Sequence, residues 1–241
     1  MTTTKDAKTA RDLTSTEPHA KEVERSSDSE IAAFIAKAKQ GGGNGRLIFA
    51  LDATMSRQPT WDRAMHHQSV MFDTVSAIGR LDVQLVYFRG FKECRASKWV
   101  ADGGELRALM ERIDCRGGHT QIGKVLAHAR KQNDVRRVAS LVFIGDAMEE
   151  KIDDLADKAG QLGLLGVRCF MFQEGRDPKA ERAFREIARL SKGAYARFDA
   201  SSAETLRDLL KAVAAFSSGG LAALEKHGGR EAQKLLPQVR G

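Results

Sequence analysis

The sequence predicts a doubly wound α/β fold, in which a mostly parallel central sheet is flanked by helices. Short apolar runs, typical of buried strands, alternate along the chain with segments whose apolar residues follow helical spacing. This alternation favours a parallel sheet that is covered on both faces. Hydrophobic residues make up 42% of the 241 residues, so we also expect a packed core.

The N-terminal part of the chain is expected to lie outside this fold. Residues 1–28 are rich in Thr, Ser, Lys and Glu and have almost no large apolar side chains. Such a segment cannot offset the entropy lost on ordering, so it is predicted to be a disordered tail. Residues 29–45 are predicted to form a helix followed by a glycine-rich linker, because helical spacing gives way to four glycines in the last five positions.

Residues 46–217 are predicted to form the folded domain. Its expected strands cover residues 47–51, 83–88, 138–144, 167–172 and 195–198, with a weaker edge strand over 94–100. Its expected helices cover residues 61–78, 106–113, 122–129, 152–162, 180–190 and 206–216. A C-terminal extension, residues 218–241, is predicted to hold a polar helix with glycine breaks.

Charge and cysteine content restrict the class of protein. The net charge is +7, and residues 1–28 hold five Lys or Arg against six Asp or Glu, so the positive excess lies in the folded part and favours an acidic partner. Cys94, Cys115 and Cys169 form no Cys-x-x-Cys pair, which argues against zinc and is typical of buried free thiols. No apolar signal segment or membrane-spanning run is present, so we expect a cytoplasmic protein and no membrane association.

Polar residues gather where the expected strands end. The first strand ends in Asp52, and Thr54 and Ser56 follow at alternate positions, on one side of an extended loop. Thr120 precedes a helix, and Asp146 follows the strand over 138–144. In an open α/β sheet, ligands bind beyond the carboxyl ends of the strands. We therefore expect these five residues to share one site.

The five side chains supply two carboxylates and three hydroxyls. Oxygen ligands of this kind suit a hard cation such as Mg²⁺, or Mn²⁺ in its place. No Cys or pair of His joins the set, which disfavours zinc and copper. Because the hydroxyls are neutral, the ion stays electrophilic, and an open coordination position would attract an anionic oxygen from outside.

The Asp-x-Thr-x-Ser segment, with the later Thr120 and Asp146, resembles the metal-ion-dependent adhesion site (MIDAS) of von Willebrand factor A (VWA) domains, which are Rossmann-like. The family pattern is Asp-x-Ser-x-Ser, then Thr, then Asp, and the resemblance covers about residues 46–216. It implies that Thr54, Ser56 and Thr120 ligate the metal, and that Asp52 and Asp146 hold it partly through waters. Three positions depart from the pattern: Thr54 in place of Ser, His119 in place of Gly, and Ala147 in place of Gly. We interpret His119 as a supporting or solvated histidine.

The resemblance implies a metal-dependent protein-binding module, in which an Asp or Glu of a partner protein completes the shell of the metal. Family analogy adds an ATPase-type or chaperone-type partner. No triad-like set of nucleophile and general base is evident, so we expect no enzyme activity. The basic residues over 176–192 are interpreted as a solvated helix face, and without interleaved aromatic residues they do not support nucleic-acid binding.

One alternative from another class stays open, a haloacid-dehalogenase-like, Mg²⁺-dependent phosphatase. Such enzymes also begin with an apolar strand that ends in a nucleophilic Asp, in the pattern Asp-x-Asp-x-Thr, but here Thr54 replaces the second Asp. Their Gly-Asp-x-x-x-Asp motif is approached by residues 145–150, with Glu150 in the last place and Lys124 as the candidate lysine. Strand order is expected to separate the two hypotheses.

Overall fold

The computed structural model describes residues 44–57, 81–199, 203–227 and 229–240. The predicted tail over 1–28, nearly all of the predicted helix and linker over 29–45, and the predicted helix over 61–78 lie outside the described residues.

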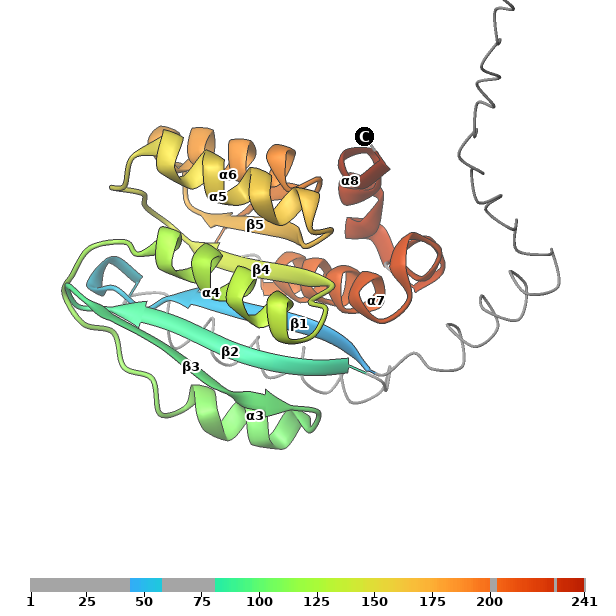
Figure 1. The fold of residues 1–241 in the computed structure, drawn as a ribbon, viewed down its shortest axis with the longest axis horizontal. Coiled ribbons are helices and arrows are strands. Elements are labelled where there is room, and N and C mark those ends of the chain that lie inside the picture. The colour runs from blue at the N-terminus through green and yellow to red at the C-terminus, as the bar shows by residue number, and fades with distance from the viewer. Residues whose placement is uncertain (1–43, 58–80, 200–202, 228, 241) are drawn as a thin grey trace, which may run out of the picture. The chain divides into compact units, whose positions relative to one another are not determined.

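A six-stranded sheet forms the centre of the described domain (Figure 1). Its strands are β1 (Gly45–Asp52), β2 (Leu81–Arg89), β3 (Glu93–Val100), β4 (Ser140–Gly145), β5 (Arg168–Glu174) and β6 (Ala194–Phe198). The strand order is β3-β2-β1-β4-β5-β6, and every neighbouring pair is parallel except β2 and β3. The predicted doubly wound, mostly parallel sheet is therefore confirmed, with the weakly patterned segment as its antiparallel edge strand.

The order of the strands reverses beside β1. The chain moves from β1 to β2 and β3 on one side of the sheet and then returns to β4 on the other side. Leu51 of β1 is paired with Ile144 of β4, so the two strands end at the same level. The loops that follow β1 and β4 therefore meet at the switch point of the sheet, where ligands of open α/β folds bind.

Helices cover both faces of the sheet. One face carries α4 (Ile122–Val135), α5 (Ile152–Leu164) and α6 (Pro178–Leu190), and the other carries α7 (Ala203–His227) (Figure 1). The short helix α3 (Gly103–Met110) follows β3, and α8 (Gly229–Arg240) follows α7. A 3-10 turn, η1 (Met55–Arg57), follows β1.

The side chains of β1 alternate between the two halves of the core. Leu47, Phe49 and Leu51 pack with the apolar faces of α3, α7 and α8. Ile48 and Ala50 pack with those of α4, α5 and α6. Strand β1 is buried on both faces because successive side chains point to opposite sides of a sheet, which explains why its sequence is apolar throughout.

The C-terminal extension contributes to this core. Helix α7 runs past the predicted end at residue 216, and the backbone leaves helical geometry at Gly219 and Gly220, where Gly220 has a φ of 67°. The buried side chains beyond this break are Leu224, Ala232, Leu235 and Val239. The predicted glycine breaks agree with this path, while the domain boundary at residue 217 stays a prediction.

Two further features of the described residues bear on the sequence analysis. Cys115 and Cys169 are buried, Cys94 is half-buried, and none of the three forms a disulfide within the described ranges, as expected. Burial raises the pKa of the Cys169 thiol to about 12. No helix in the described ranges combines the length and the apolar character that crossing a membrane requires.

Candidate metal centre

Asp52 ends β1 and is completely buried. Its Oδ1 accepts a hydrogen bond of 2.8 Å from the backbone N–H of Thr54. Its Oδ2 is also buried and has no hydrogen-bond partner among the described residues. Burial raises the pKa of Asp52 to about 6. Hydrogen bonds from Thr54 lower this pKa in part, and the negative charge of Asp146 raises it further.

Asp146 directly follows β4 and is half-buried. Its Oδ1 is buried and likewise finds no hydrogen-bond partner within the described ranges. Gly145 leaves room for the ring of Phe143, because a Cβ at this position would lie 2.8 Å from that ring, and the same Cβ position lies in ordinary contact with the Cβ of Asp52, at 3.5 Å. Two carboxylates thus stand at neighbouring strand ends, each with a buried oxygen that nothing described satisfies.

The three predicted hydroxyls come from the loops on either side. Thr54 is buried, and its Oγ1 lies 3.1 Å from the Oγ of Ser56, which is exposed in η1. Thr120 is buried just before α4, and its Oγ1 accepts a hydrogen bond of 3.0 Å from the backbone N–H of Glu149. A hydroxyl oxygen has two lone pairs, so Thr120 keeps one for another donor or a cation.

Backbone hydrogen bonds join these loops into one unit. Ala53 donates to the carbonyl of Phe88 at the end of β2 and accepts from Arg116, in both cases at 3.0 Å. Thr54 and Arg116 form an isolated parallel bridge. The Asp52 loop is therefore held on one side by β2 and on the other by the segment that leads to Thr120.

Two glutamates that follow β4, Glu149 and Glu150, were not predicted to support the metal site. A carboxylate oxygen of Glu149 accepts a hydrogen bond of 3.0 Å from the backbone N–H of Thr120. The carboxylate of Glu150 accepts from the backbone N–H groups of Ile122 and Gly123, where α4 begins with no side-chain cap of its own. These bonds tie the Asp146 loop to the Thr120 loop. The one sequence signal for this role is that Gln121, a poor capping residue, precedes α4, so that the helix needs a cap from another part of the chain.

Arg57 was also missed, and its side chain is among the largest fully buried ones. Its Nε lies 2.9 Å from Oε2 of Glu174, which ends β5 and is buried too. The positive charge of Arg57 lowers the pKa of Asp52, as a smaller effect than burial. Arginine is rarely buried without a partner, and the partner here lies more than a hundred residues away, so the local sequence gives no sign of it.

His119 contacts the rim of the site. Its side chain is exposed, its Nδ1 lies 3.0 Å from Oε2 of Glu149, and its ring meets Phe91 edge-on at 5.2 Å between centroids. This agrees with the interpretation of His119 as a supporting residue that sits beside Thr120. No group of three or more His, Cys, Asp or Glu in the described ranges is placed to hold a metal, so any cation here depends on the mixed carboxylate and hydroxyl set.

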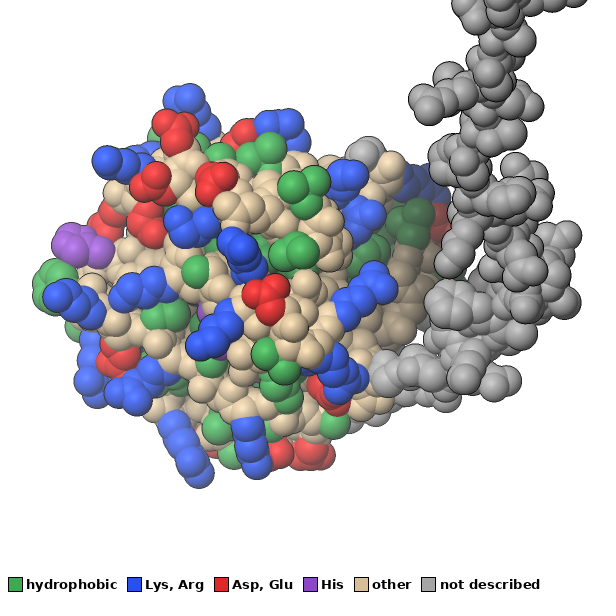
Figure 2. All heavy atoms as spheres, in the orientation of Figure 1, with side chains coloured by type: hydrophobic (Ala, Val, Ile, Leu, Met, Phe, Trp, Pro, Cys, Tyr) green, Lys and Arg blue, Asp and Glu red, His purple; other side chains and the backbone are tan. Residues whose placement is uncertain are grey.

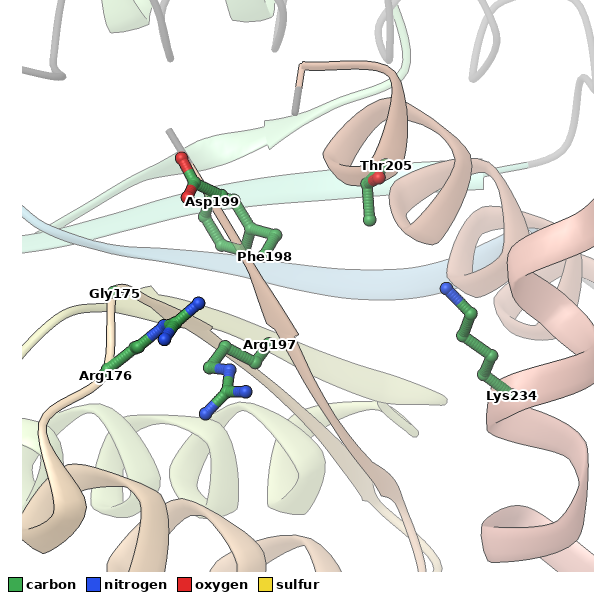
Figure 3. Close-up of a pocket in the computed structure, with 7 residues that line it drawn as sticks. All are labelled: Gly175, Arg176, Arg197, Phe198, Asp199, Thr205 and Lys234. Carbon is green, nitrogen blue, oxygen red and sulfur yellow. The ribbon is translucent and has the colours of Figure 1, made fainter. Parts of the chain in front are cut away.

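A separate cavity of about 270 Å³ opens at the same edge of the sheet, at the ends of β5 and β6 (Figure 3). Its lining includes Arg176, Arg197 and Lys234, which reach it from three different elements. Arg197 lies 3.7 Å from Glu181, and Lys234 lies 2.8 Å from Glu231, so acidic neighbours offset two of these charges. On α6, Arg185 and Arg189 are exposed and paired with Glu181 and Glu186, as expected for a solvated helix face.

Comparison with known proteins identifies the fold. No protein-family model and no curated protein matches the chain. Among solved structures, a von Willebrand factor type A protein from Catenulispora acidiphila superposes with a TM-score of 0.61 at 19% identity, over 73% of this chain and 43% of that one. The fold is that of a VWA domain.

Two other solved structures share this VWA fold. The SpRpn10 VWA domain superposes with a TM-score of 0.55 at 13% identity, over 68% of this chain and 95% of that domain. Proximal thread matrix protein 1 from the mussel byssus, in a structure with a zinc-occupied MIDAS motif, superposes with a TM-score of 0.58 at 14% identity, over 72% of this chain and 46% of that one. This chain thus spans less than half of the first and third of these proteins but nearly all of the isolated VWA domain.

Proposed function

We propose that this chain is a metal-dependent protein-binding module. In this proposal Asp52, Thr54, Ser56, Thr120 and Asp146 hold one Mg²⁺ or Mn²⁺ ion, and an Asp or Glu of a partner protein completes its shell. One observation carries the proposal. Asp52 Oδ2 and Asp146 Oδ1 are buried at neighbouring strand ends, and neither has a hydrogen-bond partner among the described residues.

The chemistry of this donor set fits a divalent cation. A buried carboxylate oxygen without a partner is costly, and two carboxylates in electrostatic contact raise that cost. A cation between them would remove both costs. The hydroxyls of Thr54, Ser56 and Thr120 add neutral oxygen donors, which Mg²⁺ and Mn²⁺ accept and which leave the positive charge of the ion largely uncompensated.

The comparisons support the proposal at the level of the fold. A structure with this fold is described with zinc in its MIDAS motif, which supports a metal site in a domain of this fold. The identity is 14%, and the ligand set of this chain therefore rests on its own residues. We place the module in the cytoplasm because its three cysteines, all within the described ranges, form no disulfide, and we propose an ATPase-type or chaperone-type protein as the partner class.

The phosphatase alternative loses its supporting residues. Glu150, which would complete the Gly-Asp-x-x-x-Asp motif, is bound to the start of α4. Lys124 Nζ donates to the carbonyl of Lys92 and to Oε1 of Gln121, and both of these residues lie outside the predicted ligand set. The chain superposes on VWA domains, so we favour binding over catalysis.

The proposal is tested by calorimetric titration with Mn²⁺. The wild-type protein should bind one ion, and Asp52→Asn should abolish binding because it removes one of the two charges. Thr120→Ala should weaken binding by about tenfold or more, whereas Thr120→Ser keeps the hydroxyl and should stay close to wild type. Asp134→Ala removes an exposed carboxylate from the far end of α4 and serves as the control. Equal binding by wild type and Asp52→Asn would contradict the proposal.

A further inference from the structure

We propose that the candidate metal lies beside an apolar subsite, formed by Met55, Phe91 and the ring of His119, that receives a hydrophobic side chain of the partner. The inference rests on the proposed function and specifies the partner. The recognised segment carries an Asp or Glu for the metal and, close to it in sequence, an aliphatic or aromatic side chain.

Two exposed apolar side chains flank the candidate metal site. Phe91 is 71% exposed at the turn between β2 and β3, and Met55 is 53% exposed between the candidate ligands Thr54 and Ser56. Isolated exposed apolar residues are common and need no explanation, but Met55 stands between two candidate ligands and Phe91 contacts His119, the neighbour of a third. The other large exposed apolar residues among those described, Val135, Leu164 and Leu165, lie at the C-terminal ends of α4 and α5.

Phe91 is held against the Thr120 loop. Its ring meets the ring of His119, and the backbone N–H of His119 donates to the carbonyl of Gly90 at 3.3 Å. Gly118 makes this contact possible, because a Cβ on Gly118 would lie 2.0 Å from that carbonyl oxygen. The ring of Phe91 therefore follows Gly90, whose carbonyl bonds to His119. Any side chain larger than hydrogen at position 118 would disrupt this hydrogen bond.

The turn that carries Phe91 is fixed on both sides. The side-chain amide of the buried Gln121 lies within hydrogen-bond distance of three carbonyl oxygens, those of Arg89, Gly90 and Glu93, at 3.2 to 3.3 Å. An exposed aromatic side chain on an anchored turn loses little conformational entropy when a partner covers it. Figure 2 shows histidine and hydrophobic surface together at the end of the molecule where the β2–β3 turn lies.

Charge indicates an acidic partner for this surface. Lys92, next to Phe91, is exposed, and the carbonyl of Lys92 accepts a hydrogen bond from Lys124 Nζ, so two cations lie beside the subsite. Two cations, a metal and an apolar side chain together match a segment in which a carboxylate stands next to a hydrophobic residue, and the carboxylate at the ring of His119, that of Glu149, is already bonded to the backbone of Thr120. A second copy of this chain is the other occupant that the experiment must address.

The experiment uses six blocked peptides and the full chain loaded with Mg²⁺, with binding followed by NMR titration. Four peptides carry Asp in a glycine background with Leu one or two positions before or after it. The fifth carries Asp in the glycine background without Leu, and is called the glycine-only peptide. The sixth is the glycine-only peptide with Asn in place of Asp. At least one of the four should bind about tenfold more tightly than the glycine-only peptide, as expected for partial burial of a leucine side chain.

Variants locate the effect. Phe91→Ser should return the best Leu peptide to the affinity of the glycine-only peptide, and Leu164→Ser, an equally polar change at a side chain that is 91% exposed, should leave it unchanged. The subsite alone would be overturned if none of the four Leu peptides bound more tightly than the glycine-only peptide. The same holds if Phe91→Ser left the affinity of the best Leu peptide unchanged. Binding of the glycine-only peptide that survives EDTA or the change to Asn would instead overturn the proposed function. Self-association of the metal-loaded chain that Phe91→Ser abolishes would assign the surface to a second copy and overturn the partner proposed here.

Discussion

Asp52 is unfavourable for stability unless a cation is bound. Its carboxylate is completely buried, one oxygen has no partner among the described residues, and its pKa is raised to about 6, chiefly by burial. An exposed Asp has a pKa of about 3.9, so the metal-free folded state binds a proton between about pH 4 and pH 6 that the unfolded chain releases. This group therefore stabilises the metal-free protein at low pH, and the contribution is lost as the pH rises through about 6.

Asp52→Asn is accordingly expected to stabilise the metal-free protein. At pH 8 in EDTA the free energy of unfolding should rise by about 1–2 kcal/mol, because a buried charge is replaced by a neutral group of the same shape. The gain should shrink at pH 5, where wild-type Asp52 is largely protonated. Urea denaturation at both pH values measures the effect. Saturating Mn²⁺ should reverse the order at pH 8, since only wild type gains binding energy. A variant less stable than wild type in EDTA at pH 8 would contradict this account.

The five candidate ligands were within reach of sequence reasoning because each stands at the end of an apolar run or just before a helix. Strand ends fix position along the sheet, and parallel strands end at one edge. The burial of Arg57 was not within reach, because it depends on Glu174 from a strand two places away in the sheet. The roles of Glu149 and Glu150 depend in the same way on a loop nearly thirty residues earlier.

At the scale of elements, the start of α4 is part of the candidate metal centre. Glu150 reaches across from the Asp146 loop to cap this helix, and Thr120 lies immediately before it. The cap of the helix and the position of a candidate ligand are therefore coupled. A change at Glu150 should alter both stability and metal affinity.

Glu150→Ala is expected to cost about 1 kcal/mol of stability, as for the loss of a helix cap, and to weaken Mn²⁺ binding by about threefold to tenfold. Asp177→Ala is the matched control. Asp177 caps α6 through a bond of 2.6 Å to the backbone N–H of Ala180, away from the candidate ligands, so its loss should lower stability without changing Mn²⁺ affinity. Thermal unfolding and calorimetry report the two quantities. Equal Mn²⁺ affinity in both variants would show that the cap and the site are independent.

Most described elements agree with the sequence prediction to within a few residues, because their apolar patterns are strong. The final helices agree as well. The pattern predicts a helix ending at 216 and another beginning at 221, and helical geometry is interrupted between these positions, at Gly219 and Gly220. The buried residues Ala232, Leu235 and Val239 of α8 follow helical spacing, but the sequence does not show which half of the core they join, because that depends on the direction of the chain after the break at Gly219 and Gly220.

At the scale of the whole molecule, the C-terminal helix completes the core on the α7 side of the sheet. Leu235 is fully buried there. Leu235→Ala should therefore reduce the free energy of unfolding by about 2–5 kcal/mol through lost burial and the cavity that remains. Gln233→Ala changes an exposed residue of the same helix and should have little effect. Urea denaturation distinguishes these outcomes, and similar stabilities for both variants would mean that α8 is only loosely attached.

The contact between α8 and β6 also bears on solubility. The side-chain amide of Gln238 accepts from the backbone N–H of Tyr195 and donates to its carbonyl, at 2.9 and 3.1 Å, as a neighbouring strand would. It thus occupies the hydrogen-bonding groups of Tyr195 on the open edge of β6, while β3 at the opposite edge carries the exposed charges of Arg95 and Lys98. Open strand edges template the pairing of one chain with another. Proteolytic loss of α8 would therefore expose unpaired backbone groups of β6, and the trimmed domain would accumulate as oligomers paired through this strand.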